Sequence, residues 1–148
     1  MRYKKNTRPN VILMIDDNPT DVLLIKEAFA FCEGIYEIYV AEDGVHAIEF
    51  LKQQGQYHEA PRPDIILLDL NMPRKNGFEV LTEVKADPDF RSIPTLIYTS
   101  SVVKEDIRIA YNSYANGYVR KSVDFDECIK IAKSIKDFWF SASILYEP

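Results

Sequence analysis

The segment PDIILLDLNMPRKNG, residues 63–77, constrains the fold more than any other stretch of the chain. It opens with four consecutive apolar residues, 65–68. A short apolar run without polar alternation is typical of a strand covered on both faces, as in a parallel sheet. The run ends at Asp69, at the strand end where open α/β sheets bind their ligands. Asp69 is therefore either a site residue or only a cap of the following helix.

Four further strand-like runs alternate with helical patterns along the chain. We expect strands at residues 11–15, 36–41, 65–68, 94–98 and 118–120, and helices within residues 18–34, 44–51, 78–87, 107–114 and 124–140. Alternation of this kind gives a parallel sheet with helices on both faces. The sequence therefore predicts a doubly wound α/β domain with five parallel strands.

Composition excludes several classes of protein. A chain of 148 residues has the length of one domain. Its net charge of −5 argues against electrostatic binding to nucleic acid over a broad surface. No apolar run has the length of a membrane span. The basic residues near the N-terminus, Arg2, Lys4, Lys5 and Arg8, are expected to form a solvated tail.

The two cysteines and the first residues of the chain predict a location. Cys32 and Cys128 lie in helical apolar stripes, so we expect buried free thiols, which fit a reducing compartment. No signal peptide is apparent. The protein is expected to be cytoplasmic.

Polar side chains stand at the carboxyl ends of four of the five predicted strands. The first strand is followed by Asp16 and Asp17, the third by Asp69, the fourth by Thr99 and the fifth by Lys121. If these four strands are neighbours, their ends meet at one edge of the sheet. Three carboxylates, one hydroxyl and one ammonium would then converge on a small volume.

Such a cluster calls for a cation. Two carboxylates about 4 Å apart repel by roughly 4 kcal/mol at an effective dielectric constant near 20, and one ammonium does not neutralise three of them. All expected ligands are oxygens, which favours Mg²⁺, with Mn²⁺ or Ca²⁺ as substitutes. A carboxylate beside Mg²⁺ can attack phosphorus, while a cation and a hydroxyl stabilise the phosphoryl oxygens. Lys121 and Thr99 suit these two roles.

With these residues, the chain resembles the receiver domain of two-component response regulators. The resemblance is carried by the acidic pair Asp16–Asp17, by Asp69 within LLDLNMP, by Thr99 and by Lys121 within GYVRK, and it covers residues 11 to about 140. It implies a flavodoxin-like sheet of order 2-1-3-4-5 and a single domain over residues 1–148, with a core at about 10–140.

The resemblance also implies roles for the site residues. Asp69 would accept the phosphoryl group from a histidine kinase. Asp17 and Asp69 would bind Mg²⁺ through their carboxylates, Asn71 through its backbone carbonyl and Asp16 through a water. The protein would catalyse only its own phosphorylation and dephosphorylation.

Further residues carry the expected signal. Thr99 and Lys121 would bind phosphoryl oxygens, and Tyr118 matches the switch aromatic of the fifth strand. Phosphorylation would then change the face formed by the fourth helix, the fifth strand and the fifth helix. Ser122 stands where the family usually has a proline after the lysine, so it is open whether the Lys121–Ser122 peptide is cis.

The last helix carries more apolar residues than one buried stripe needs. The surplus predicts an interface, and we expect a homodimer through the fourth helix, the fifth strand and the fifth helix, extended by an aromatic tail at about 138–148. The alternative is that the tail folds back over the surplus. The surplus residues are Ile131, Phe138, Trp139 and Phe140. The chain resembles stand-alone receivers paired with phytochrome-type histidine kinases, which carry such extensions.

Two other functions compete with this hypothesis. A Mg²⁺-dependent phosphatase with an aspartyl nucleophile normally has a second acid two residues later, where this chain has Asn71. A flavin-binding module would need a phosphate-binding loop after the first strand, where Asp16 and Asp17 would repel phosphate.

Overall fold

The computed structural model describes residues 8–148. Its elements are β1 (Asn10–Ile15), α1 (Pro19–Phe29), β2 (Tyr36–Ala41), α2 (Gly44–Leu51), a 3₁₀ turn (Gly55–Tyr57), β3 (Ile65–Leu68), α3 (Gly77–Ala86), β4 (Thr95–Thr99), α4 (Lys104–Asn112), β5 (Gly117–Arg120), α5 (Phe125–Asp137) and a π-helical turn (Phe138–Ala142). Across this part of the chain, no helix combines the length and apolarity that a membrane span requires.

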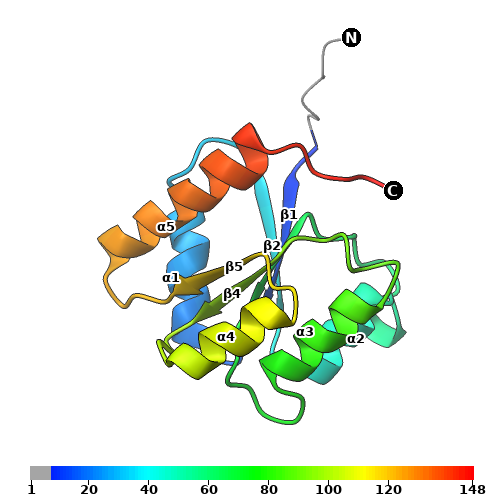
Figure 1. Ribbon diagram of the computed structural model, residues 1–148. Coiled ribbons are helices and arrows are strands. Elements are labelled where there is room, and N and C mark those ends of the chain that lie inside the picture. Colours follow the sequence, from blue (N-terminus) through cyan, green and yellow to red (C-terminus); the bar gives the residue numbers. More distant parts are fainter. Residues whose placement is uncertain (1–7) are drawn as a thin grey trace.

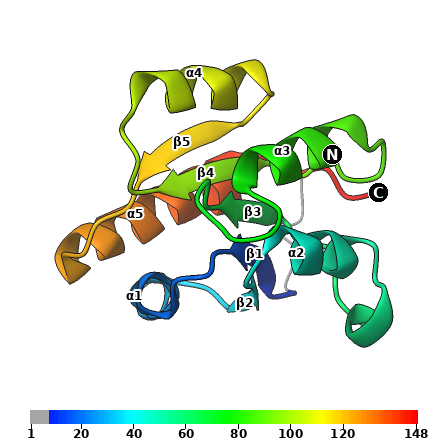
Figure 2. The ribbon, with the colours of Figure 1, turned by 90° about the horizontal axis from the view of Figure 1, so that it is seen from below.

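The five strands form one parallel sheet in the order β2-β1-β3-β4-β5, which confirms the predicted α/β fold and strand order. Helices α1 and α5 cover one face, and α2, α3 and α4 cover the other (Figures 1 and 2). Because each crossover helix returns the chain to the same end of the sheet, all carboxyl ends lie along one edge.

Alternation along the central strands builds a core on each face. Leu13, Ile15 and Leu68 face the layer of α2 and α3, while Met14 and Leu67 face the layer of α1 and α5. All four residues of β3 are at most 1% exposed, as an apolar run without alternation predicts. The strand that ends at Asp69 is therefore held rigidly from both sides.

Local capping determines where the helices start. Asn18 accepts hydrogen bonds from the backbone N–H groups of Thr20 and Asp21, and Pro19 occupies the first position of α1. The predicted end of this helix at Gly34 is wrong, because α1 ends at Phe29. The next residues form i→i+3 hydrogen bonds up to Cys32, which tighten the chain into a turn before Gly34.

The prediction of a buried free thiol is confirmed for Cys128 and only in part for Cys32. Cys128 and Cys32 are both free, and Cys128 is buried, whereas Cys32 is only half-buried beside the core. Burial raises the pKa of both thiols.

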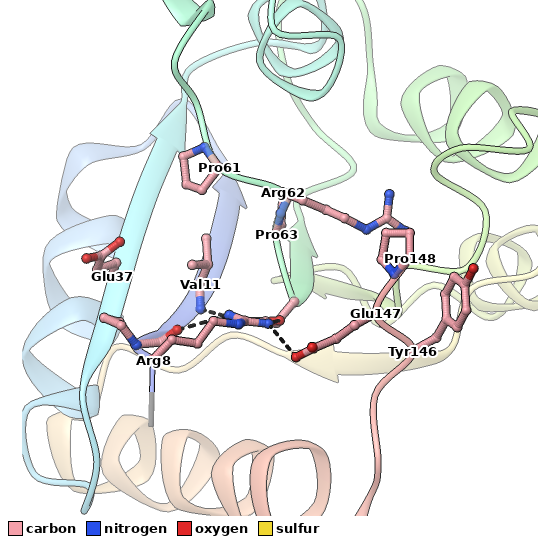
Figure 3. Close-up of a pocket in the computed structure, with 11 residues that line it drawn as sticks. Arg8, Val11, Glu37, Pro61, Arg62, Pro63, Tyr146, Glu147 and Pro148 are labelled. Atoms are coloured by element: carbon pink, nitrogen blue, oxygen red, sulfur yellow. Dashed lines mark hydrogen bonds and ion pairs between the residues drawn. The ribbon is translucent and has the colours of Figure 1, made fainter. Parts of the chain in front are cut away.

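The two ends of the described chain meet beside the amino end of the sheet (Figure 1). Arg8 donates two hydrogen bonds to Asp64, of 2.6 and 2.8 Å, and one of 3.0 Å to Glu147 in the C-terminal tail (Figure 3). These residues line a pocket of about 410 Å³. Arg8 is exposed, as expected of a solvated tail, but a carboxylate from the loop before β3 also fixes its position. Arg2, Lys4 and Lys5 lie outside the described residues.

Substitution of Gly77 tests how tightly the loop after β3 is packed. A Cβ atom at this first residue of α3 would meet the Asp69 carbonyl oxygen and would lie 2.7 Å from the Leu70 Cα. Both neighbours are backbone atoms and cannot move aside. We expect Gly77→Ala to lower the free energy of unfolding by about 2 kcal/mol in urea titrations.

Gly117→Ala is the matched control. There the added Cβ would meet only the end of the Leu96 side chain, at 3.0 Å, which can shift. Equal losses of stability in the two variants would contradict the close backbone packing at Gly77.

Candidate functional site

Backbone hydrogen bonds that continue the ladder past the strands align the site residues. The amide of Asp16 donates to the Ala41 carbonyl at 3.0 Å, and the amide of Asp69 donates to the Ile15 carbonyl at 2.9 Å. Lys121 follows β5 directly, and its amide donates to the Thr99 carbonyl at 2.8 Å. The first residues after each strand are therefore positioned as firmly as the strands themselves.

Three carboxylates gather at this edge, as the sequence predicts. Asp16 and Asp69 are 2% and 6% exposed, whereas Asp17 is exposed to solvent. Each offers an oxygen within 4.8 Å of the other two. A groove of about 400 Å³ extends from Asp16 and Asp17 along α1 toward the end of β2, so the cluster is open on one side.

The Lys121 ammonium lies among these carboxylates, as predicted. Its Nζ is 2.7 Å from Asp16 Oδ2 and 3.3 Å from Asp69 Oδ2, and the Lys121 side chain is 7% exposed. Burial opposes the charge on Lys121, but the short contact with the charged Asp16, the hydrogen bond to Asp21 and the charge of Asp69 raise the pKa of Lys121 above its usual value. The side chain therefore stays a cation.

A fourth carboxylate, which the sequence analysis does not place at the site, also contacts Lys121. Asp21, in the first turn of α1, accepts a 2.9 Å hydrogen bond from the ammonium. Its position near the helix start suggests only a favourable interaction with the helix dipole. A weak signal was available, because helical side chains tilt toward the N-terminus and α1 starts beside the end of β1.

The donor set fits a hard divalent cation. Asp16 Oδ2 is buried, and its short contact with Lys121 lacks hydrogen-bond geometry. Burial raises the pKa of Asp16 because it removes water from the carboxylate, and the nearby Lys121 offsets this effect only in part. Carboxylates with an open side suit Mg²⁺, which keeps several waters. Asn71, an expected backbone ligand, is exposed two residues after Asp69, and its amide lies 3.4 Å from Asp69 Oδ1.

The predicted switch residues lie next to one another. Thr99, fully buried at the end of β4, has its Oγ1 3.4 Å from the Ser101 amide. The Tyr118 hydroxyl donates to the Ser101 carbonyl at 2.9 Å, and the Ser101 hydroxyl donates to Asp106 in α4 at 2.7 Å. This chain of contacts joins the edge of the sheet that carries the carboxylates to α4 and β5. The Lys121–Ser122 peptide is trans, since the described residues contain no cis peptide.

Most of the predicted interface residues pack against their own core. Ile131, Trp139 and Phe140 are half-buried against the α1–α5 core, where the Phe140 ring lies 5.9 Å from the Tyr36 ring. Only Phe138, which is 56% exposed, presents most of its surface to solvent. The tail continues to Glu147 at the amino end of the sheet, so it does not lie along α5 (Figure 1).

Comparisons with known proteins agree with this geometry. The family described as "Response regulator receiver domain" matches residues 12–133. Response regulator Rcp1 of Synechocystis sp. is 38% identical over 137 residues, which span 93% of each chain.

Two solved structures are also similar. The phosphorylated cyanobacterial phytochrome response regulator RcpA has a TM-score of 0.89 and 38% identity, and the match covers 95% of this chain and 100% of that one. The Mn²⁺-bound form of Rcp1 has a TM-score of 0.86 and 37% identity, over 94% and 100%.

Substitution of Asp16 tests whether the carboxylates at this site carry more negative charge than Lys121 balances. Its raised pKa means that the native protein binds this proton more tightly than the unfolded chain does, so the resulting stabilisation is present below about pH 3.8 and is lost as pH rises through the raised pKa. We expect metal-free Asp16→Asn to be about 1 kcal/mol more stable than the wild type at pH 7, with a difference that shrinks toward pH 4.

The exposed Asp17 provides the control. Asp17→Asn removes an equal charge but should change metal-free stability less, because water screens it. Mg²⁺ should raise the melting temperature of the wild type more than that of either variant. An Asp16→Asn protein with the pH dependence of the wild type would contradict a strained buried carboxylate.

Proposed function

The chain belongs to the response regulator receiver domain family, and we propose that Asp69 accepts a phosphoryl group from a sensor histidine kinase. The observation that carries this proposal is the convergence of Asp16, Asp17, Asp69 and Lys121 at one edge of the sheet. Within this chain the receiver domain stands alone, with residues 138–148 as a C-terminal extension. The protein then acts as a single-domain response regulator of a two-component system.

Asp69 is well placed to act as the nucleophile. Its carboxylate is 6% exposed, lies on the open cluster and contacts the Lys121 ammonium at 3.3 Å. In the transfer, a bond forms between an Asp69 oxygen and phosphorus, while the bond between phosphorus and the kinase histidine nitrogen breaks. The electron pair of that broken bond returns to the imidazole.

Lys121 and Thr99 would bind the phosphoryl oxygens. Lys121 is already a buried cation beside Asp69, and Thr99 ends the neighbouring strand with its hydroxyl at the same edge. Asp16, Asp17, Asp69 and the Asn71 carbonyl would hold Mg²⁺, or Mn²⁺ or Ca²⁺ in its place. The bound metal would neutralise charge on the phosphoryl group. The residues that face the group are thus positioned before it arrives.

The response would travel through the contacts of Ser101. Movement of Thr99 toward the phosphoryl group pulls on the Ser101 amide, and Ser101 contacts both Tyr118 and Asp106. The α4–β5–α5 face would therefore change when Asp69 is phosphorylated. The half-buried Tyr118 is the aromatic residue in this chain of contacts.

The rival phosphatase function has less support. Asn71 stands two residues after Asp69, and an amide cannot protonate a leaving group. We therefore propose that the protein turns over no separate substrate and catalyses only its own phosphorylation and dephosphorylation.

The proposed partner is a phytochrome-type histidine kinase. Similarity to the phytochrome response regulator RcpA over nearly the whole chain supports this choice. We further propose a cytoplasmic location and no nucleic-acid or membrane partner, which the net charge of −5 favours.

A homodimer through the α4–β5–α5 face is the proposed assembly. Tyr111 and Tyr114, on and just after α4, are 51% and 76% exposed, and Phe138 after α5 is 56% exposed. Exposed aromatic residues of this kind favour an interface. Ile131, Trp139 and Phe140 would contribute indirectly, by fixing the end of α5 against the core.

Substitution of Asp69 tests the phosphoacceptor. We expect acetyl phosphate with Mg²⁺ to add one phosphoryl group to the wild type, measured as an increase in intact mass. Asp69→Asn should remain unlabelled, because an amide is a poor nucleophile. Asp17→Asn should be labelled more slowly, because it keeps the nucleophile and loses a metal ligand. Full labelling of Asp69→Asn would refute the assignment.

Charge substitutions on the exposed aromatic residues test the dimer. In sedimentation velocity, we expect the wild type to be a dimer and Tyr111→Glu with Phe138→Glu to be a monomer, because a buried unpaired charge opposes association. Ile35→Glu is the control, since Ile35 is 65% exposed in the turn between α1 and β2. A monomeric wild type, or dissociation by Ile35→Glu alone, would count against this interface.

A further inference from the structure

Lys121 has a carboxylate neighbour that belongs neither to a strand end nor to the candidate metal cluster. That neighbour is Asp21, in the first turn of α1. We propose that Asp21 is a positioning residue that restrains the Lys121 ammonium and competes for it with a phosphoryl group on Asp69. This inference rests on the function proposed above.

Two of the three carboxylates around the ammonium accept a hydrogen bond from it, and Asp21 accepts the shorter one. The bond from Lys121 Nζ to Asp21 Oδ2 is 2.9 Å and has hydrogen-bond geometry, whereas the bond to Asp69 Oδ2 is 3.3 Å. The 2.7 Å contact with Asp16 lacks hydrogen-bond geometry. An ammonium has three N–H donors, and Asp21 shares this one with Asp69 and with the closely placed Asp16.

Burial makes this contact stronger than a surface ion pair. The side chains of Lys121 and Asp21 are 7% and 18% exposed, so water screens the two charges only weakly. The Tyr98 ring, whose centre lies 5.9 Å from the ammonium, covers a further side of it. Lys121 therefore has few other partners to which it could turn.

A phosphoryl group on Asp69 changes the competition. It adds roughly two negative charges and three acceptor oxygens within reach of the same ammonium. Lys121 can strengthen its contact with these oxygens only by moving toward Asp69 and loosening the bond to Asp21. Asp21 therefore opposes the phosphorylated state and limits how firmly Lys121 holds it.

The role of Asp21 can be separated from that of the site itself. Its carboxylate is not one of the three that could share a metal ion, so its removal leaves Asp16, Asp17 and Asp69 in place. Asp21→Asn keeps the size and the acceptor oxygen of the side chain and removes only the charge.

Equilibrium binding of beryllofluoride in the presence of Mg²⁺ tests the competition, because this probe occupies the place of a phosphoryl group on a carboxylate. We expect Asp21→Asn to bind it roughly fivefold more tightly than the wild type, the difference between a charge-assisted and a neutral hydrogen bond. Asp21→Glu should restore the wild-type affinity. Glu27→Gln removes an acid from an exposed part of α1 and should have no effect.

A second measurement needs neither metal nor probe. The ¹⁵N signal of the Lys121 ammonium, assigned by its loss in Lys121→Ala, should show slow proton exchange in the metal-free wild type. In Asp21→Asn the exchange should become faster, and in Glu27→Gln it should stay unchanged. This readout reports the restraint directly, and a purely structural role elsewhere in α1 would not move it.

The outcomes separate this inference from the function on which it rests. If the wild type binds beryllofluoride, Asp69→Asn does not, and Asp21→Asn binds it no more tightly than the wild type, the competition is overturned while the proposed function stands. Unchanged ammonium exchange in Asp21→Asn would also overturn it. If the wild type fails to bind beryllofluoride at all, both proposals fall.

Discussion

The cluster of carboxylates around one buried ammonium is the constraint on which the rest of this structure depends. Lys121 Nζ lies within 3.3 Å of oxygens from Asp16, Asp21 and Asp69, while Asp17 stands at the exposed side. One positive charge cannot balance this set in a partly buried site. The fold therefore maintains a local excess of negative charge, which binds hard cations and makes the site respond strongly to an added phosphoryl group.

The parallel sheet makes this unfavourable arrangement possible. The two strands that lead to Asp16 and Asp69 are central and buried on both faces, and their ladder continues one residue past each strand. The hydrophobic free energy of the two cores holds the carboxylates together against their repulsion. The favourable packing of the core thus offsets the unfavourable charge repulsion at the site, as is common for functional sites.

The same edge is connected to the surface by a short path. Thr99 and Lys121 end neighbouring strands, and Ser101 links the loop after Thr99 to both Tyr118 and Asp106. In the function proposed above, a change of charge at Asp69 would reach α4 and β5 through these adjacent contacts. At the opposite edge, Arg8 joins the C-terminal tail to the loop before β3 through Asp64 and Glu147.

The resemblance to receiver domains implied the strand order. The sequence by itself determined the α/β class, the strand that carries Asp69 and the polar residues that follow the other strands, Asp16, Asp17, Thr99 and Lys121. These features follow from local patterns, since apolar runs and their polar ends repeat along the chain. Only the tertiary structure decided that Asp21 contacts Lys121, that Arg8 binds Asp64 and Glu147, and that Trp139 and Phe140 pack inward. Each of these depends on contacts between residues far apart in the sequence. A local pattern cannot specify them, because the direction of a side chain and the path of a tail are set by what packs around them.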